Sequence, residues 1–130
     1  MSARILIIED SPDYLEIVSF YLRASGFIVE TAQDGREGLT KARNEPFDLI
    51  ITDLMLPSHS SYEICTMLRQ DVRFQRIPIV VLTASKLHAK DEELAKNCGA
   101  DAFCPKSTEP RKLVEKLREL IAAASSGPPA

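Results

Sequence analysis

Residues 4–12 read RILIIEDSP, and this short stretch contains a complete change from strand to helix. The run from Arg4 to Glu9 has an apolar centre at residues 5–8 that is rich in β-branched side chains, which is typical of a strand buried on both faces. Ser11 and Pro12 follow at once and predict a helix, because serine caps helix N-termini and proline suits the first helical position. A buried strand that leads directly into a helix is the repeating unit of an α/β fold.

The rest of the chain repeats this unit. Further strands are predicted at residues 27–32, 47–52, 77–82 and 101–104. The first helix is expected to stop at Gly26, and the second to begin at Asp34 with Glu37 as its capping-box partner. The third helix should follow Ser60, and the fourth should span residues 89–98. The last helix should begin near Thr108. This alternation predicts a five-stranded, doubly wound parallel sheet of the flavodoxin-like class, with strand order 2-1-3-4-5.

Length and composition limit the function. The 130 residues make one domain, which we place at residues 1–122, and residues 123–130 are expected to form a flexible tail or the start of a linker. A net charge of −3 argues against nucleic-acid binding by this chain and gives no reason to expect membrane binding. No signal peptide or membrane-spanning run is found, which favours the cytoplasm. The three cysteines lack the spacing of a zinc site and are expected to be reduced.

Polar residues collect where the predicted strands end. Glu9 and Asp10 follow the first strand, Asp53 the third, Thr83 the fourth and Lys106 the fifth. In the predicted order these strands are neighbours, so their ends should form one site. Three carboxylates this close repel one another, and a hard divalent cation, Mg²⁺ or Mn²⁺, would neutralise them. A lysine and a hydroxyl suit phosphoryl oxygens, and the central Asp53 is the candidate nucleophile.

These residues, in this order, resemble the receiver domain of two-component response regulators, including the chemotaxis type. The resemblance covers residues 4–122 and depends on the Glu9-Asp10 pair, the DLMLP run from Asp53, Thr83-Ala84, and the GAD run at 99–101 followed by Phe103 and Lys106. It implies that Asp53 is the phosphoacceptor. It implies Mg²⁺ bound by Asp10, Asp53 and the main-chain carbonyl of Met55, with Glu9 acting through water.

The resemblance also implies a switch and partners. Thr83, Lys106 and the main-chain N–H of Ala84 would hold the phosphoryl group, and Thr83 and Phe103 would form the switch. The surface made by the fourth helix, the fifth strand and the fifth helix would then be repacked. The donor would be a histidine kinase or phosphotransfer protein, and the output an effector protein, a covalently linked effector domain or a phosphorylation-dependent dimer. The chain would be a signalling domain that promotes its own phosphorylation and dephosphorylation, not an enzyme acting on an outside substrate.

Two positions depart from the family pattern. Ser107 follows the lysine where the family usually has proline, which puts the shape of the Lys106 loop in question. Ser61 stands where the family usually has glycine, and we expect Ser60 and Ser61 to cap the next helix instead. Neither change removes an acid or the lysine.

Two other functions remain as alternatives. An aspartyl-phosphate phosphatase commonly has a second acid two residues after its nucleophile, where this chain has Met55. A degenerate receiver used only for binding would normally lose an acid or the lysine.

The apolar residues Tyr14, Ile17 and Tyr21 on the first helix have two interpretations, packing or a kinase-docking surface, and we favour packing.

Overall fold

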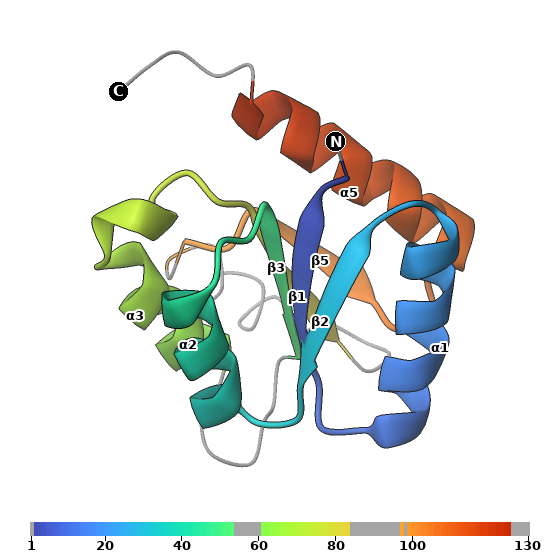
Figure 1. Ribbon diagram of the computed structural model, residues 1–130, viewed down its shortest axis with the longest axis horizontal. Helices are drawn as coiled ribbons and strands as arrows, with labels where there is room; N and C mark the ends of the chain where they lie inside the picture. Colours follow the sequence, from blue (N-terminus) through green and yellow to red (C-terminus); the bar gives the residue numbers. More distant parts are fainter. Residues whose placement is uncertain (1, 54–60, 84–96, 98, 126–130) are drawn as a thin grey trace.

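In the computed structural model, residues 2–53, 61–83, 97 and 99–125 are described, and they contain one parallel sheet. The strands run in the order β2-β1-β3-β4-β5, which confirms the predicted topology (Figure 1). Their bounds are β1 Arg4–Ile8, β2 Ile28–Ala32, β3 Leu49–Asp53, β4 Ile79–Thr83 and β5 Ala102–Pro105. Strands β1, β3, β4 and β5 are therefore contiguous, and β2 forms the outer edge of the sheet beside β1.

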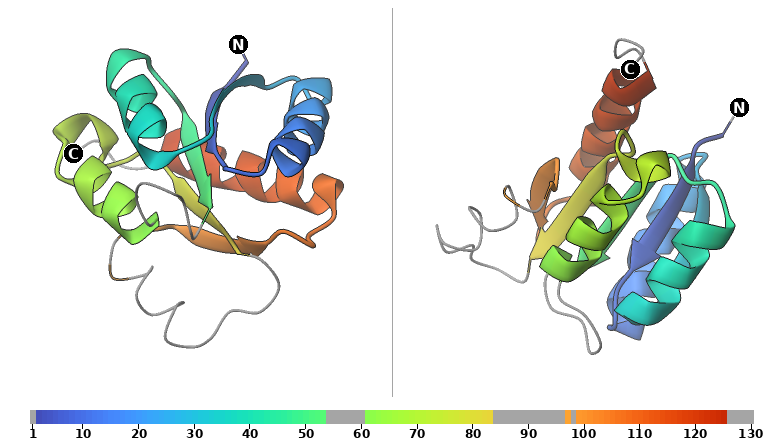
Figure 2. Two further views of the ribbon diagram at one scale, coloured as in Figure 1. Left: turned by 90° about the horizontal axis from the view of Figure 1, so that it is seen from below. Right: turned by 90° about the vertical axis from the view of Figure 1, so that its left-hand side faces the viewer.

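Helices cover both faces of the sheet, as Figure 2 shows. Helices α1 (Pro12–Ala24) and α5 (Pro110–Ser125) lie on one face, and α2 (Gly35–Asn44) and α3 (Ser61–Arg69) lie on the other; a 3₁₀ turn, Val72–Phe74, follows α3. The predicted helix at 89–98 falls outside the described residues except for Asn97. None of the described helices is long and apolar enough to cross a membrane.

Strand side chains alternate between two cores because neighbouring residues of a strand point to opposite faces. Ile5 and Ile7 of β1 pack with α1 and α5, whereas Leu6 and Ile8 pack with α2 and α3. All four are fully buried. This two-sided burial explains why the strands read as continuous apolar runs and not as alternating ones.

Both predicted helix starts in the first half of the chain are confirmed. The Ser11 hydroxyl accepts the N–H of Tyr14, and the Asp34 carboxylate accepts the N–H of Glu37 at 2.8 Å. The return half of the capping box differs: the Glu37 carboxylate accepts the N–H of Gln33, one residue before the cap. Helix α1 ends before Gly26, whose φ of +98° is a conformation that glycine adopts without strain.

Strand and helix ends depart from the predictions by a few residues. Strand β3 begins at Leu49, and directly before it the Asp48 carboxylate accepts the main-chain N–H of Arg4 at the start of β1. Helix α5 begins at Pro110 and continues to Ser125, past residue 122 where fraying was expected. Three consecutive alanines, the strongest helix formers, account for this extension. Cys65 and Cys104 are buried, and neither forms a disulfide within the described part of the chain, whereas Cys98 lies outside it.

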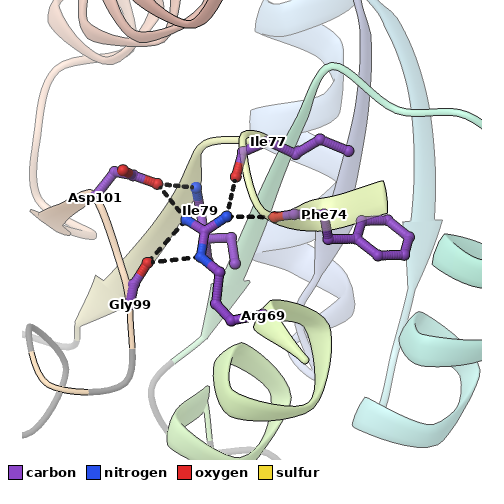
Figure 3. A network of polar contacts seen from close by, with 6 residues as sticks. All are labelled: Arg69, Phe74, Ile77, Ile79, Gly99 and Asp101. Carbon is purple, nitrogen blue, oxygen red and sulfur yellow. Dashed lines mark hydrogen bonds and ion pairs between the residues drawn. The ribbon is translucent and has the colours of Figure 1, made fainter. Parts of the chain in front are cut away.

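Arg69, the last residue of α3, connects this helix to the starts of β4 and β5 (Figure 3). Its guanidinium pairs with the Asp101 carboxylate at 2.7 Å, and that carboxylate also accepts the N–H of Ile79 at 2.8 Å. The same guanidinium donates to three main-chain carbonyls, those of Phe74, Ile77 and Gly99. One side chain therefore holds together the ends of the strands opposite the polar residues described next.

Candidate functional site

The carboxyl ends of β1, β3, β4 and β5 meet at one end of the sheet, the lower end in Figure 1. Glu9 and Asp10 directly follow β1, Asp53 and Thr83 are the last residues of β3 and β4, and Lys106 directly follows β5. The predicted strand order therefore brings these positions together, as expected from the sequence.

Three carboxylates form a cluster at this end. One oxygen from each of Glu9, Asp10 and Asp53 lies within 4.8 Å of the others. Glu9 is fully buried and Asp53 nearly so, whereas Asp10 is exposed. The cluster thus has two buried acids that cannot be screened well by water and one acid at its solvent side.

Lys106 is the cation of the site. Its Nζ lies 2.8 Å from Glu9 Oε2, donates to Glu9 Oε1 at 3.0 Å, and lies 3.2 Å from Asp53 Oδ2. Its main-chain N–H donates to the Thr83 carbonyl at 2.7 Å, which fixes the loop after β5 beside the end of β4. The lysine therefore reaches the acids although Ser107 replaces the usual proline. No cis peptide bond occurs among the described residues.

Burial and charge shift the pKa values in this group. Burial raises the pKa of Glu9, and hydrogen bonds from Lys106 and the Ser11 N–H offset part of that increase. Burial acts to lower the pKa of Lys106, but hydrogen bonds to Glu9 and Asp53 and their charges outweigh it, so the pKa is raised. The lysine is therefore charged at neutral pH. The cluster holds three acidic side chains and Lys106 pairs with two of them, Glu9 and Asp53, which leaves the site with capacity for a further cation.

The Thr83 hydroxyl is a second polar group of the site whose hydrogen-bonding capacity is not used. It is buried, and among the described residues it has no hydrogen-bond partner. A buried hydroxyl without a partner is uncommon, because leaving such a group unsatisfied costs about 1–3 kcal/mol. It is consistent with a group that receives its partner only when a ligand binds.

Several predicted site groups are not described or keep untested roles. The Met55 carbonyl and the Ala84 N–H lie outside the described residues. Phe103 is half-buried on β5 and packs against the core under α2 and α3. Its part in a switch remains a prediction, as do the roles of Glu9, Asp10, Asp53, Thr83 and Lys106.

Sequence reasoning missed two neighbours of the site. The Ser11 N–H donates to Glu9 Oε1 at 3.0 Å, so the first turn of α1 holds the buried acid as well as beginning the helix. The Tyr14 ring lies with its centroid 5.0 Å from Lys106 Nζ. Burial raises the pKa of Tyr14 to about 12. Tyr14 was assigned to the apolar pattern of its helix, and nothing in that pattern indicates a partner 92 positions later.

The packing interpretation of α1 is also wrong in part. Ile17 and Tyr21 are 55% and 46% exposed, and Phe20, which the sequence did not single out, is 67% exposed. Only Tyr14 of the original three contacts the core. Helix α1 therefore presents an apolar surface to solvent, the α1 surface, made by Ile17, Phe20 and Tyr21.

Comparison with known proteins agrees with this geometry. Residues 5–118 match the family model of the response regulator receiver domain. The chain is 37% identical to the DNA-binding response regulator MtrA of Mycolicibacterium smegmatis over 118 residues, which is 91% of this chain and 50% of that protein.

Two solved structures have the same fold. The chemotaxis response regulator CheY4 of Vibrio cholerae has a TM-score of 0.87 at 31% identity, over 92% of this chain and 99% of that one. The receiver domain of a sensor histidine kinase from Pseudomonas aeruginosa, solved with a magnesium ion in its active site cleft, has a TM-score of 0.86 at 27% identity, over 94% and 99%.

The chain spans about half the length of the curated relatives that it matches. The family model, by contrast, covers most of the chain, from β1 into α5. By this match, by its relatives and by its fold, the chain belongs to the response regulator receiver domain family of two-component signalling.

Proposed function

We propose that this receiver domain accepts a phosphoryl group on Asp53 in a reaction that requires Mg²⁺. The observation that carries the proposal is the arrangement around Asp53. Its carboxylate lies in a cluster with Glu9 and Asp10 and is paired with Lys106 at 3.2 Å. A nucleophilic carboxylate next to a metal-binding acid and a phosphate-binding lysine has what phosphoryl transfer needs.

The acid cluster fits a divalent cation. Its oxygens are hard ligands, they are close enough to share one ion, and a single lysine leaves their charge incompletely neutralised. Asp10 and Asp53 would hold the ion, with Glu9 contributing through water. When bound, Mg²⁺ would neutralise charge on the transferring phosphoryl oxygens.

The chain's own residues supply the rest of the chemistry. An Asp53 carboxylate oxygen attacks phosphorus, and the bond from phosphorus to the donor breaks as the new phosphorus–oxygen bond forms. Lys106 is already charged beside Asp53 and would move from the acids to the phosphoryl oxygens. The buried, unpartnered Thr83 hydroxyl would donate to the same oxygens. Movement of Thr83 would then be transmitted to Phe103, and the surface at β5 and α5 would be repacked for an effector.

The donor would be a phosphohistidine on a kinase or phosphotransfer protein. The α1 surface supports this partner, because three large apolar side chains on one exposed helix face are typical of a protein-interaction surface. Helix α1 also begins at the site itself, so a partner bound there would lie next to Asp53.

The test is intact-protein mass spectrometry after incubation with acetyl phosphate. The wild-type protein should gain one phosphoryl group with Mg²⁺ and none with a chelator, and Asp53→Asn should gain none under either condition. Asp48→Asn is the matched control, because Asp48 directly precedes β3 at the opposite end of the strand from Asp53, and it should behave as the wild type. An unmodified wild-type protein would favour the phosphorylation-independent binding module instead.

A further inference from the structure

Among the residues that the structure describes, three side chains lie against the ammonium of Lys106, and one of them is not an acid. Two sides face the Glu9 and Asp53 carboxylates, and the Tyr14 ring lies 5.0 Å from Nζ. We propose that Tyr14 is a positioning residue for Lys106, whose ring keeps the ammonium directed at the phosphoacceptor. This inference rests on the proposed phosphoryl transfer and adds a residue to it.

The geometry satisfies the donors of the lysine. An ammonium has three N–H groups, and a cation within about 6 Å of an aromatic centroid is attracted by the negative face of the ring. The Glu9 and Asp53 carboxylates accept hydrogen bonds from one side of the Lys106 ammonium, and the Tyr14 ring lies against its other side. The Lys106 side chain is 22% exposed, so the contact is partly desolvated, which makes a cation–π interaction stronger than at an open surface.

Tyr14 is itself held in place. It lies in the first turn of α1, where its N–H donates to the Ser11 hydroxyl that caps the helix. Its ring packs against the core between the sheet and helices α1 and α5. The ring is therefore fixed by backbone and packing, and it can serve as a rigid wall for the more flexible lysine side chain.

The Lys106 side chain has an alternative space beside the site. A cavity of about 320 Å³ lies between α1 and the start of α5, and both Tyr14 and Lys106 line it. Without the ring, this space would be available to a lysine side chain that turns away from the acids. The contribution of the Tyr14 ring to holding Lys106 is greatest once a cation neutralises the acids. The attraction of Glu9 and Asp53 for the ammonium then falls, whereas the attraction of the uncharged ring is unchanged.

The experiment compares Tyr14→Leu with Tyr14→Phe, using acetyl phosphate as the donor. A small donor removes any effect on partner docking at the neighbouring α1 surface. Tyr14→Leu should slow phosphorylation by about fivefold, the size of a partly desolvated cation–π contact, and Tyr14→Phe should stay within about twofold of wild type because it keeps the ring. In a Lys106→Met background, Tyr14→Leu should cause no further slowing, because the partner of the ring is already gone.

Two further measurements separate positioning from simple packing. Phe47→Leu removes a ring that lies under Arg4 at the opposite end of the sheet, so it should lower the melting temperature and leave the phosphorylation rate unchanged. The ring-current shift of the Lys106 ε-methylene protons in an NMR spectrum should persist in Tyr14→Phe and vanish in Tyr14→Leu.

An unchanged rate in Tyr14→Leu would overturn the proposal, as would an equal slowing with and without Lys106. If the wild-type protein is not phosphorylated at all, the proposed function itself fails, which is a different result from a phosphorylated wild type with an unaffected Tyr14→Leu.

Discussion

Replacing Lys106 with methionine should destabilise the protein mainly by leaving two buried acids without a cation. Glu9 is fully buried, and the Asp53 side chain is 11% exposed. Breaking a fully buried ion pair by removing one partner costs about 3–5 kcal/mol. Because the Lys106 side chain is 22% exposed, water relieves part of that penalty, and we expect a loss of about 2–3 kcal/mol at neutral pH. For a domain of this size, that loss lowers the melting temperature by roughly 8 °C.

The loss should depend on pH in a defined direction. The pKa of Glu9 is raised above its ordinary value of 4.5 in the folded protein, so the fold binds this proton more tightly than the unfolded chain does. Stability therefore falls as pH rises from 4.5 through the folded pKa. The lysine's hydrogen bond lowers this pKa, so Lys106→Met should raise it further and extend the fall to higher pH. The variant should be close to wild type at about pH 4 and clearly weaker at about pH 7.

Urea denaturation at both pH values measures these differences. Lys112→Met on the exposed side of α5 is the matched control and should change stability by less than about 0.5 kcal/mol at either pH. Mg²⁺ should recover more stability in Lys106→Met than in wild type, because the cation replaces the missing charge. A variant as stable as wild type at neutral pH, or a loss of equal size at both pH values, would refute the electrostatic account of this site.

Two further predictions follow from the same structure. Mg²⁺ at a hundred times its dissociation constant should stabilise wild type by about 2.7 kcal/mol. Asp10→Asn should lose most of this gain, and without metal it should melt slightly higher than wild type because one repelling charge is gone. A metal-dependent shift in thermal melts that survives Asp10→Asn would contradict the ligand assignment. Arg69→Met should lower the free energy of unfolding by about 2–4 kcal/mol, because it leaves the Asp101 carboxylate and three main-chain carbonyls without their shared donor. Arg73→Met is its control, since that arginine pairs with Asp71 at an exposed position and should lower the free energy of unfolding far less in the same urea titration. Equal losses would show that the Arg69 network contributes no more than a surface pair.

The fold and most of the site follow from local sequence signals. The strands are short apolar runs that contrast with the amphipathic helices, and the crossover rule then limits the strand order. Once the order is known, the positions after each strand must lie together, which is why Glu9, Asp53 and Lys106 could be grouped before their contacts were known. These positions depend on sheet topology alone, and a shift of one residue in a strand's end does not move them apart.

Other features depend on tertiary packing and leave no local signal. The contact between Tyr14 and Lys106 requires the rotation of α1 and the path of the loop after β5, and neither is encoded in a periodic pattern. Asp48 and Asp101 look like ordinary strand-flanking acids, yet both accept main-chain N–H groups of neighbouring strands. The exposure of Phe20 likewise follows from which face of α1 meets the sheet, and that face is selected by the whole core.

The most direct test of the central claim is to locate the phosphoryl group on the chain. Sodium borohydride reduces an aspartyl phosphate to homoserine, which survives digestion and peptide sequencing by mass spectrometry. After treatment with acetyl phosphate and Mg²⁺, we expect homoserine at position 53 and at no other aspartate, and none when a chelator replaces the metal. Homoserine at Asp10 or another aspartate, or incorporated phosphate with no homoserine at position 53, would contradict the assignment of Asp53 as the phosphoacceptor.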